Sequence, residues 1–169
     1  MSLFVISQLL AICSLLIGIT AFQLQQRKYI LRGWSLALLF YAAHFALLHQ
    51  SVAALFILIN ATRLYVGSCT TGRRWMVFFM SVVVLHFFIS EKQPIHVLAF
   101  VAALLGTCGS FISRVMQMRM VMALVSLLWM VHNVIINSPA GFFSEMIYFS
   151  SNLIGMVRYL QHRTDQSAE

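Results

Sequence analysis

The chain has 169 residues, of which 61% are apolar and 9% are charged. Soluble domains carry about 25% charged residues, so this composition excludes an ordinary water-soluble fold and indicates an integral membrane protein. The net charge of +7 does not indicate a nucleic-acid partner, because the basic residues are scattered beside apolar runs and form no basic helix.

Seven apolar stretches follow one another, near residues 3–25, 30–49, 51–70, 73–90, 95–113, 115–137 and 139–161. A helix needs about 20 apolar residues to cross a bilayer, and it satisfies its own backbone groups in lipid. The first stretch lacks the basic start and the cleavage site of a signal peptide, so we expect it to be retained. The sequence therefore predicts an all-α integral membrane protein with seven transmembrane helices.

The basic residues predict the orientation of these helices. If every stretch crosses the membrane, ten of the eleven Lys and Arg residues lie on one side and Lys92 lies opposite. Basic residues in short loops stay in the cytoplasm, so we expect a periplasmic N-terminus, a cytoplasmic C-terminus and a short cytoplasmic tail at 162–169. The ten residues are Arg27, Lys28, Arg32, Arg63, Arg73, Arg74, Arg114, Arg119, Arg158 and Arg163.

An internal repeat relates the first three stretches to the last three. The segment that ends at His44 matches the one that ends at His132, 88 residues later, and Asn60 matches Asn152 at an offset of 92 residues. One helical turn inserted near Ser138 explains the change of offset. The alternative is that any two apolar helices align loosely.

The repeat predicts a 3+1+3 arrangement within a single transmembrane domain at 1–161. Repeat one covers 3–70, a linker helix covers 73–90 and repeat two covers 95–161. Three spans and one linker give the two triple-helix repeats the same orientation, so we expect them to be parallel and related by an axis along the membrane normal.

Three strings, LLIGITAF, ILINATRL and WMVHNVI, resemble the YgjV family of bacterial inner-membrane proteins over about Phe4 to Arg158. The resemblance implies a multi-pass protein of the inner membrane. More distantly, the 3+1+3 plan is similar to the SWEET sugar transporters, the PQ-loop proteins and the vitamin carrier PnuC. In SWEET proteins an asparagine of each third repeat helix faces the substrate cavity, and Asn60 and Asn152 occupy corresponding places. The prolines within the first helix of each SWEET repeat are missing, which leaves Gly18 and Gly106 as candidate bending sites.

Polar residues inside the spans predict a substrate site. Such side chains cost free energy in hydrocarbon and often mark a pathway. We expect Asn60 and Asn152 to contact a substrate near the midplane, and Trp129 and Asn133 to line the wall. The alternative is that the two midplane asparagines bond each other and only hold the repeats together.

Three ionisable residues predict gating or proton coupling. Glu145 is the acidic residue within the spans, and His44 and His132 stand at matching places. A histidine beside a carboxylate can change its charge near neutral pH; the alternative is a set of hydrogen bonds between helices. The residue spacing predicts no metal site and no cofactor.

These features predict a carrier that moves a small neutral or cationic metabolite by rocking two repeats around a polar midplane site. No phosphate loop, metalloprotease motif or nucleophile elbow occurs in the sequence, so we expect no enzymatic activity. The alternative function is a non-transporting membrane protein, such as an assembly partner or a sensor.

Overall fold

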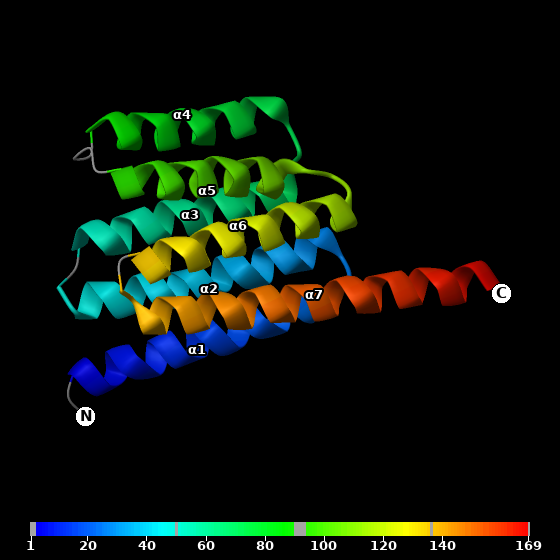
Figure 1. Cartoon of the computed structure of the whole chain (residues 1–169), viewed down its shortest axis with the longest axis horizontal. Coiled ribbons are helices and arrows are strands. Elements are labelled where there is room, and N and C mark those ends of the chain that lie inside the picture. The colour runs from blue at the N-terminus through cyan, green and yellow to red at the C-terminus, as the bar shows by residue number, and fades with distance from the viewer. Residues whose placement is uncertain (1–2, 50, 90–93, 136, 169) are drawn as a thin grey trace.

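The computed structural model describes residues 3–49, 51–89, 94–135 and 137–168. Over these residues the chain forms seven helices and no strand (Figure 1). The helices are α1 (Leu3–Gln23), α2 (Arg27–Leu47), α3 (Ser51–Cys69), α4 (Arg73–Ile89), α5 (Pro94–Phe111), α6 (Val115–Ile135) and α7 (Pro139–Ala168).

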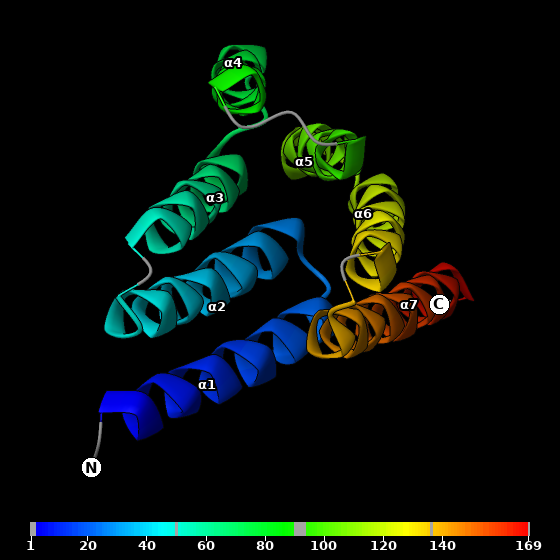
Figure 2. The same ribbon diagram turned by 60° about the vertical axis from the view of Figure 1, so that its left-hand side comes forward.

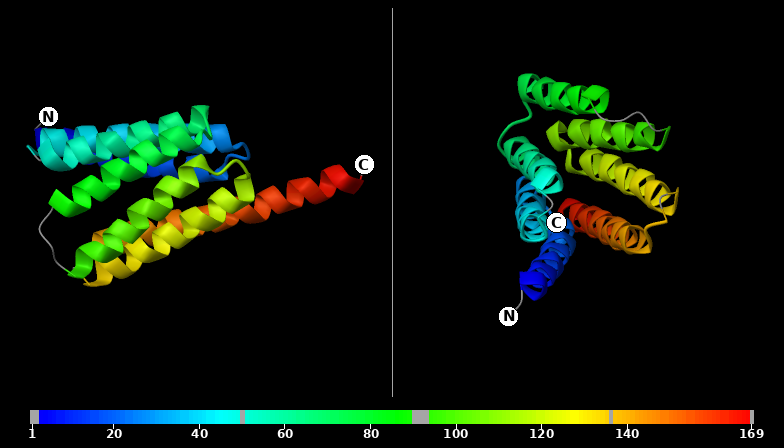
Figure 3. Two further views of the ribbon diagram at one scale, coloured as in Figure 1. Left: turned by 90° about the horizontal axis from the view of Figure 1, so that it is seen from above. Right: turned by 90° about the vertical axis from the view of Figure 1, so that its left-hand side faces the viewer.

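Two rows of helices face each other (Figure 2). One row consists of α1, α2 and α3 packed in chain order, and the other of α5, α6 and α7. The rows meet along two edges, where α7 packs against α1 and α5 packs against α3. Helix α4 packs on α5 and α3 beyond the second edge, and α7 extends past the other helices toward its C-terminal end (Figure 3).

The helices have the surface of a membrane protein. Large apolar side chains are exposed along them, as at Leu16, Leu85 and Ile89, and hydrocarbon rather than water solvates such faces. By length and composition, α1, α2 and α6 can cross a membrane, and shorter apolar segments lie at Ala54–Cys69 and His96–Phe111. The all-helical membrane fold is thus confirmed in outline, and seven complete spans stay a prediction.

Local sequence sets several helix ends. Prolines begin α5 and α7, at a position where the missing N–H has no helical partner. His49 and Asn137, just after α2 and α6, have positive φ angles of 59° and 53°, and this left-handed conformation stops a helix. Helix α7 continues to Ala168, through most of the segment predicted to be a tail.

The two ends of the bundle differ. We call the end where α1, α3 and α5 finish and α2, α4 and α6 begin the basic end, because it carries Arg27, Arg73 and Arg114. A cluster of buried apolar residues also lies there, formed by Phe22, Ile30, Leu31, Leu64, Met118 and Met122. Lys92, the basic residue predicted at the opposite end, lies outside the described residues.

Arg119, which the sequence analysis grouped with the basic residues of the cytoplasmic side, does not face water. Arg119 lies inside α6 and its side chain is 0% exposed. A buried arginine needs hydrogen-bond partners to offset its desolvation, and Arg119 finds them on α7 and at the end of α1.

Candidate functional site

Arg119 ties α6 to α1 and α7. Its Nη1 donates to the Phe22 carbonyl at 2.8 Å and to Asn152 Oδ1 at 3.2 Å, and its Nη2 donates to the Leu24 carbonyl. The two carbonyls lie at the C-terminal end of α1, where a helix leaves its last acceptors without partners and where the helix dipole favours a cation. Arg119 therefore caps α1 while it joins the two rows.

Asn152 belongs to the same contact. It is 1% exposed, and its Nδ2 donates to the Arg119 carbonyl at 2.8 Å while its Oδ1 accepts from the guanidinium. A Cβ added at Gly155, about one turn further along α7, would collide with the Phe22 carbonyl and the Arg119 guanidinium. The close approach of α7 to α1 thus requires a glycine at this place.

Arg27 closes the second edge in the same manner. Its Nη2 donates to the carbonyls of Gly67 on α3 and Ser110 on α5, both at 2.6 Å, and its Nε donates to the Ile112 carbonyl. A Cβ at Gly67 would lie 2.6 Å from the Ser110 carbonyl oxygen. At the basic end, each edge between the rows therefore combines an arginine with a glycine.

Further polar contacts run along the edges. Ser151 Oγ on α7 donates to the Ile19 carbonyl at 2.9 Å. On the other edge, Arg63 Nη1 donates to Thr107 Oγ1 at 2.7 Å and to the Ala103 carbonyl at 3.3 Å. Arg63 thus reaches across to α5, so its head group serves the contact between the rows.

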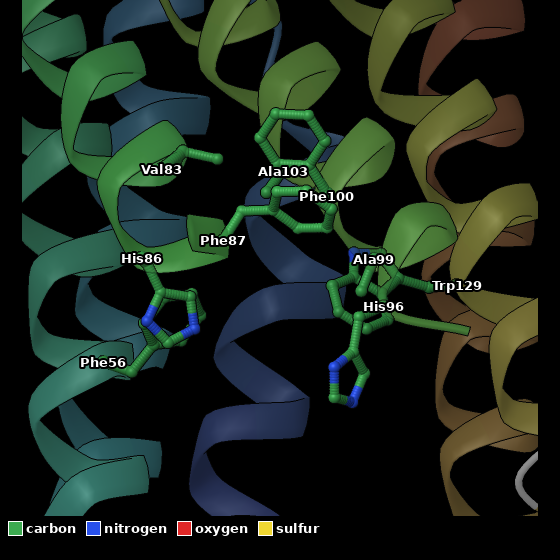
Figure 4. Close-up of a pocket in the computed structure, with 9 residues that line it drawn as sticks. All are labelled: Phe56, Val83, His86, Phe87, His96, Ala99, Phe100, Ala103 and Trp129. Atoms are coloured by element: carbon green, nitrogen blue, oxygen red, sulfur yellow. The ribbon is translucent and has the colours of Figure 1, made fainter. Parts of the chain in front are cut away.

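A cavity of about 200 Å³ lies toward the opposite end, between α3, α4, α5 and α6 (Figure 4). Phe87 and Phe100 stack with their ring centroids 4.3 Å apart, and the rings of Phe56 and His86 are 4.8 Å apart. Six of the lining side chains carry rings: Phe56, His86, Phe87, His96, Phe100 and Trp129.

The four residues predicted to bind substrate occupy different environments. Trp129 lines the cavity. Asn60 donates to the Phe56 carbonyl of its own helix at 3.0 Å, and Asn133 donates to the Trp129 carbonyl at 2.8 Å. Both asparagines are bonded to residues that line the cavity, whereas Asn152 lies in the packed contact with Arg119.

The two histidines predicted to gate or couple protons have unlike partners. His44 is buried, and its Nδ1 lies 2.8 Å from the Ser7 carbonyl of α1. The His132 ring packs edge-on against Trp129, and its Nδ1 is buried without a hydrogen-bond partner in the described part of the chain. His132 is therefore a neighbour of the cavity, and His44 joins two helices of the first row.

Glu145 lies between the rows among hydroxyl groups. Its carboxyl group interacts electrostatically with Tyr41 on α2 and Tyr148 on α7, and with the hydroxyl group of Ser126 on α6. Tyr148 also packs against Gly18 of α1. Within the described ranges, no three His, Cys, Asp or Glu side chains gather closely enough to hold a metal ion.

The model of a protein family, Imp-YgjV, described as bacterial inner membrane protein, matches residues 5–163 of this chain. The match covers nearly the whole chain and agrees with the resemblance carried by the three strings. No curated protein and no solved structure matches the chain.

Proposed function

Because the chain belongs to the YgjV family of bacterial inner membrane proteins, we propose that it is a carrier that moves a small molecule across this membrane. The two rows of helices would rock against each other and open the space between them first at one end and then at the other. Substrate would enter from the cavity at the opposite end and leave through the basic end.

One observation carries this proposal: the two ends of the bundle are unlike. Arg27 and Arg119 join the rows at the basic end, while a partly enclosed cavity lies toward the opposite end. A carrier at rest on one side of its cycle would have its rows joined at one end and a pocket toward the other, although a pocket lined by Gln23, Gln25 and Arg158 also lies at the basic end.

Matched contacts support a repeat. Arg27 binds the carbonyls of Ser110 and Ile112, and Arg119 binds those of Phe22 and Leu24. Each carbonyl of the second pair comes from a residue 88 positions before its counterpart in the first. In transporters with parallel repeats, equivalent contacts lie around the axis along the membrane normal that relates the two repeats.

Other pairs have the same spacing of 88 residues. Gly67 and Gly155 lie at the two edges, and His49 and Asn137 have positive φ after α2 and α6. At the offset of 88 residues, the counterpart of Asn152 is Leu64 and not Asn60, although Arg27 and Arg119 themselves are 92 residues apart. We therefore assign Asn152 to the basic end, and keep Trp129, Asn60 and Asn133 as the residues on the substrate side.

The arginine contacts suit a gate. Each arginine donates to neutral carbonyl groups, and a hydrogen bond to a charged group stabilises by about 1.5–3 kcal/mol. Glu145 lies between the rows and stays our candidate for proton coupling, with His132 beside the cavity.

A second function, a non-transporting assembly partner or sensor, is favoured by one observation. The buried Arg119 and Asn152 bind each other through two hydrogen bonds, as expected of a static scaffold, although Arg119 Nε has no hydrogen-bond partner in the described part of the chain. For either function we expect no enzymatic activity.

Uptake into proteoliposomes tests the carrier. Purified protein reconstituted into vesicles should take up at least one labelled compound of a panel of small neutral and cationic metabolites, and should exchange it with unlabelled compound inside. Protein-free vesicles provide the control. If the folded protein, checked by a cooperative thermal transition, takes up no compound of a broad panel, the carrier is contradicted and the scaffold is favoured.

A further inference from the structure

We infer that the cavity between α3, α4, α5 and α6 binds an uncharged planar aromatic molecule of one or two rings. The inference rests on the proposed carrier function in taking this molecule as the cargo, and the cavity is its entry site. Lining side chains come from four helices of both rows and the linker (Figure 4), so a bound molecule touches every part that rocking would displace.

The size of the cavity sets the first limit. Pockets for drug-sized ligands enclose about 300–1,000 Å³, whereas this one encloses about 200 Å³. It therefore suits a molecule smaller than a nucleoside or a disaccharide.

The lining sets the shape of the ligand. Phe87 and Phe100 stack at 4.3 Å with an interplanar angle of 25°, and Phe56 and His86 lie at 4.8 Å with an angle of 34°. The rings of each pair cover each other's facing sides, so a guest meets their edges and outer sides, and such aromatic contacts stabilise an aromatic guest beyond its apolar burial. Aliphatic molecules gain the burial without these contacts.

The charges and polar groups set its chemistry. No Asp, Glu, Lys or Arg lines the cavity, so a charged guest would be desolvated without a counter-ion. A polyol would also leave hydroxyl groups without partners, because the ring nitrogens of His86, His96 and Trp129 are the polar side-chain atoms of the lining. An uncharged ring with one or two polar atoms would leave few polar groups without partners in such a lining.

The polar groups also lie where a guest would enter. His86 is near the end of α4 and His96 near the start of α5, so both flank the opposite end of the bundle, while Ala103 lies two turns deeper in α5. The Ala103 carbonyl accepts a hydrogen bond from Arg63. The cavity thus runs from a histidine rim to a floor held by the contact between α3 and α5.

Calorimetric titration of the full-length protein in nanodiscs tests this inference. The probes are indazole, which is planar and uncharged, sorbitol as a neutral polyol, and benzamidine as a planar cation. Indazole should bind saturably and more tightly than the other two. Trp129→Leu should weaken indazole binding about tenfold, because a stacking face is lost, while Trp129→Phe should stay within about threefold of the wild type.

The matched control is Trp75→Leu, which removes an exposed tryptophan at the basic end of α4 and should leave indazole binding unchanged. Equal binding by the wild type and by folded Trp129→Leu protein would overturn the inference, and so would tighter binding of sorbitol or benzamidine. Saturable indazole binding without any transport would refute the carrier and leave the site standing. Uptake of a compound that Trp129→Leu does not affect would refute the site and leave the carrier standing.

Discussion

Arg27 and Arg119 occupy an unusual position for charged residues in an apolar bundle. Within the described chain, their hydrogen bonds go to backbone carbonyls and to one asparagine. The free carbonyls at a helix C-terminus carry partial negative charge, so a helix end can replace a carboxylate as the partner. Each arginine side chain therefore provides hydrogen bonds to free carbonyl groups at a helix end and at the same time joins the two rows.

The residues of the candidate site could be predicted only in part. Trp129 stood out as an aromatic residue beside polar side chains inside a span, and it lines the cavity. Arg119 was missed because it stands near the start of the sixth stretch, close to Arg114, where a basic residue is expected to face the cytoplasm. The burial of Arg119 depends on its contact with the end of α1, where its partner Phe22 lies 97 positions earlier in the chain. A contact over this separation cannot be predicted from residue spacing in one sequence.

The glycine at the first edge gives a prediction for a single residue. Gly155→Ala should lower stability by about 1–3 kcal/mol, because the added methyl group has no room beside the Phe22 carbonyl and overpacking forces a shift. Thermal unfolding in detergent, followed by fluorescence, measures the effect. Gly106→Ala is the matched control, since its nearest contact would be an ordinary 3.4 Å to Arg63 Nη1; a loss as large there would contradict the argument.

The positions of the helices in the sequence were largely predictable, but the pairs of helices that pack against each other were not. Apolar runs of near 20 residues, bounded by basic residues, glycines or prolines, predicted seven helices with ends within a few residues of those observed. The departure is α7, whose polar residues after 161 continue the helix. Which helices meet depends on close approaches at Gly67 and Gly155, and a glycine in an apolar span has no unique partner in sequence.

The residue offset of the proposed repeat shows the same limit. Two rare asparagines suggested an offset of 92 residues, which is also the spacing of Arg27 and Arg119, whereas the carbonyl groups that these arginines bind are 88 residues apart. Two residues of the same rare type are easily aligned with each other even where their contacts differ. Asn60 donates a hydrogen bond within its own helix, whereas Asn152 donates one to α6.

The contact between Arg119 on α6 and Asn152 on α7 gives a prediction about how these two helices stabilise each other. Arg119→Met and Asn152→Leu should each destabilise the protein by about 1–3 kcal/mol, because each leaves buried groups without partners. The double variant should lose less than the sum by about 0.5 kcal/mol or more, as contacting residues do. In the control cycle, Arg119→Met and Asn60→Leu should be additive within about 0.5 kcal/mol. Additivity in both cycles would show that the Arg119–Asn152 contact carries no energy.

At the scale of the whole molecule, the fold is two rows of helices joined along two edges, with α4 beyond one of them. Composition and the positive-inside pattern predicted a membrane protein, and the family match places it in the bacterial inner membrane. The rows follow from contacts far apart in sequence, and the orientation of the bundle in the membrane is still a prediction.

Cysteine labelling tests that orientation. Cys69 is exposed at the end of α3, on the basic end, and Cys13 and Cys108 can be replaced by alanine. We expect an impermeant maleimide to label Cys69 in inverted inner-membrane vesicles and not in spheroplasts. His49→Cys, placed at the opposite end in a cysteine-free background, should show the reverse pattern. Labelling of Cys69 in spheroplasts would put the basic end in the periplasm.

The most direct test of the carrier is whether the basic end opens in the native protein, and this measurement needs no known substrate. Ser110 is 0% exposed beneath the Arg27 contact, so Ser110→Cys, in a protein without other cysteines, reports opening through its reaction with a water-soluble maleimide. We predict that the native protein reacts far faster than it unfolds, and that Arg27→Gln raises the rate about tenfold or more by removing charge-assisted hydrogen bonds. Reaction only at the rate of global unfolding, with or without Arg27, would contradict the account.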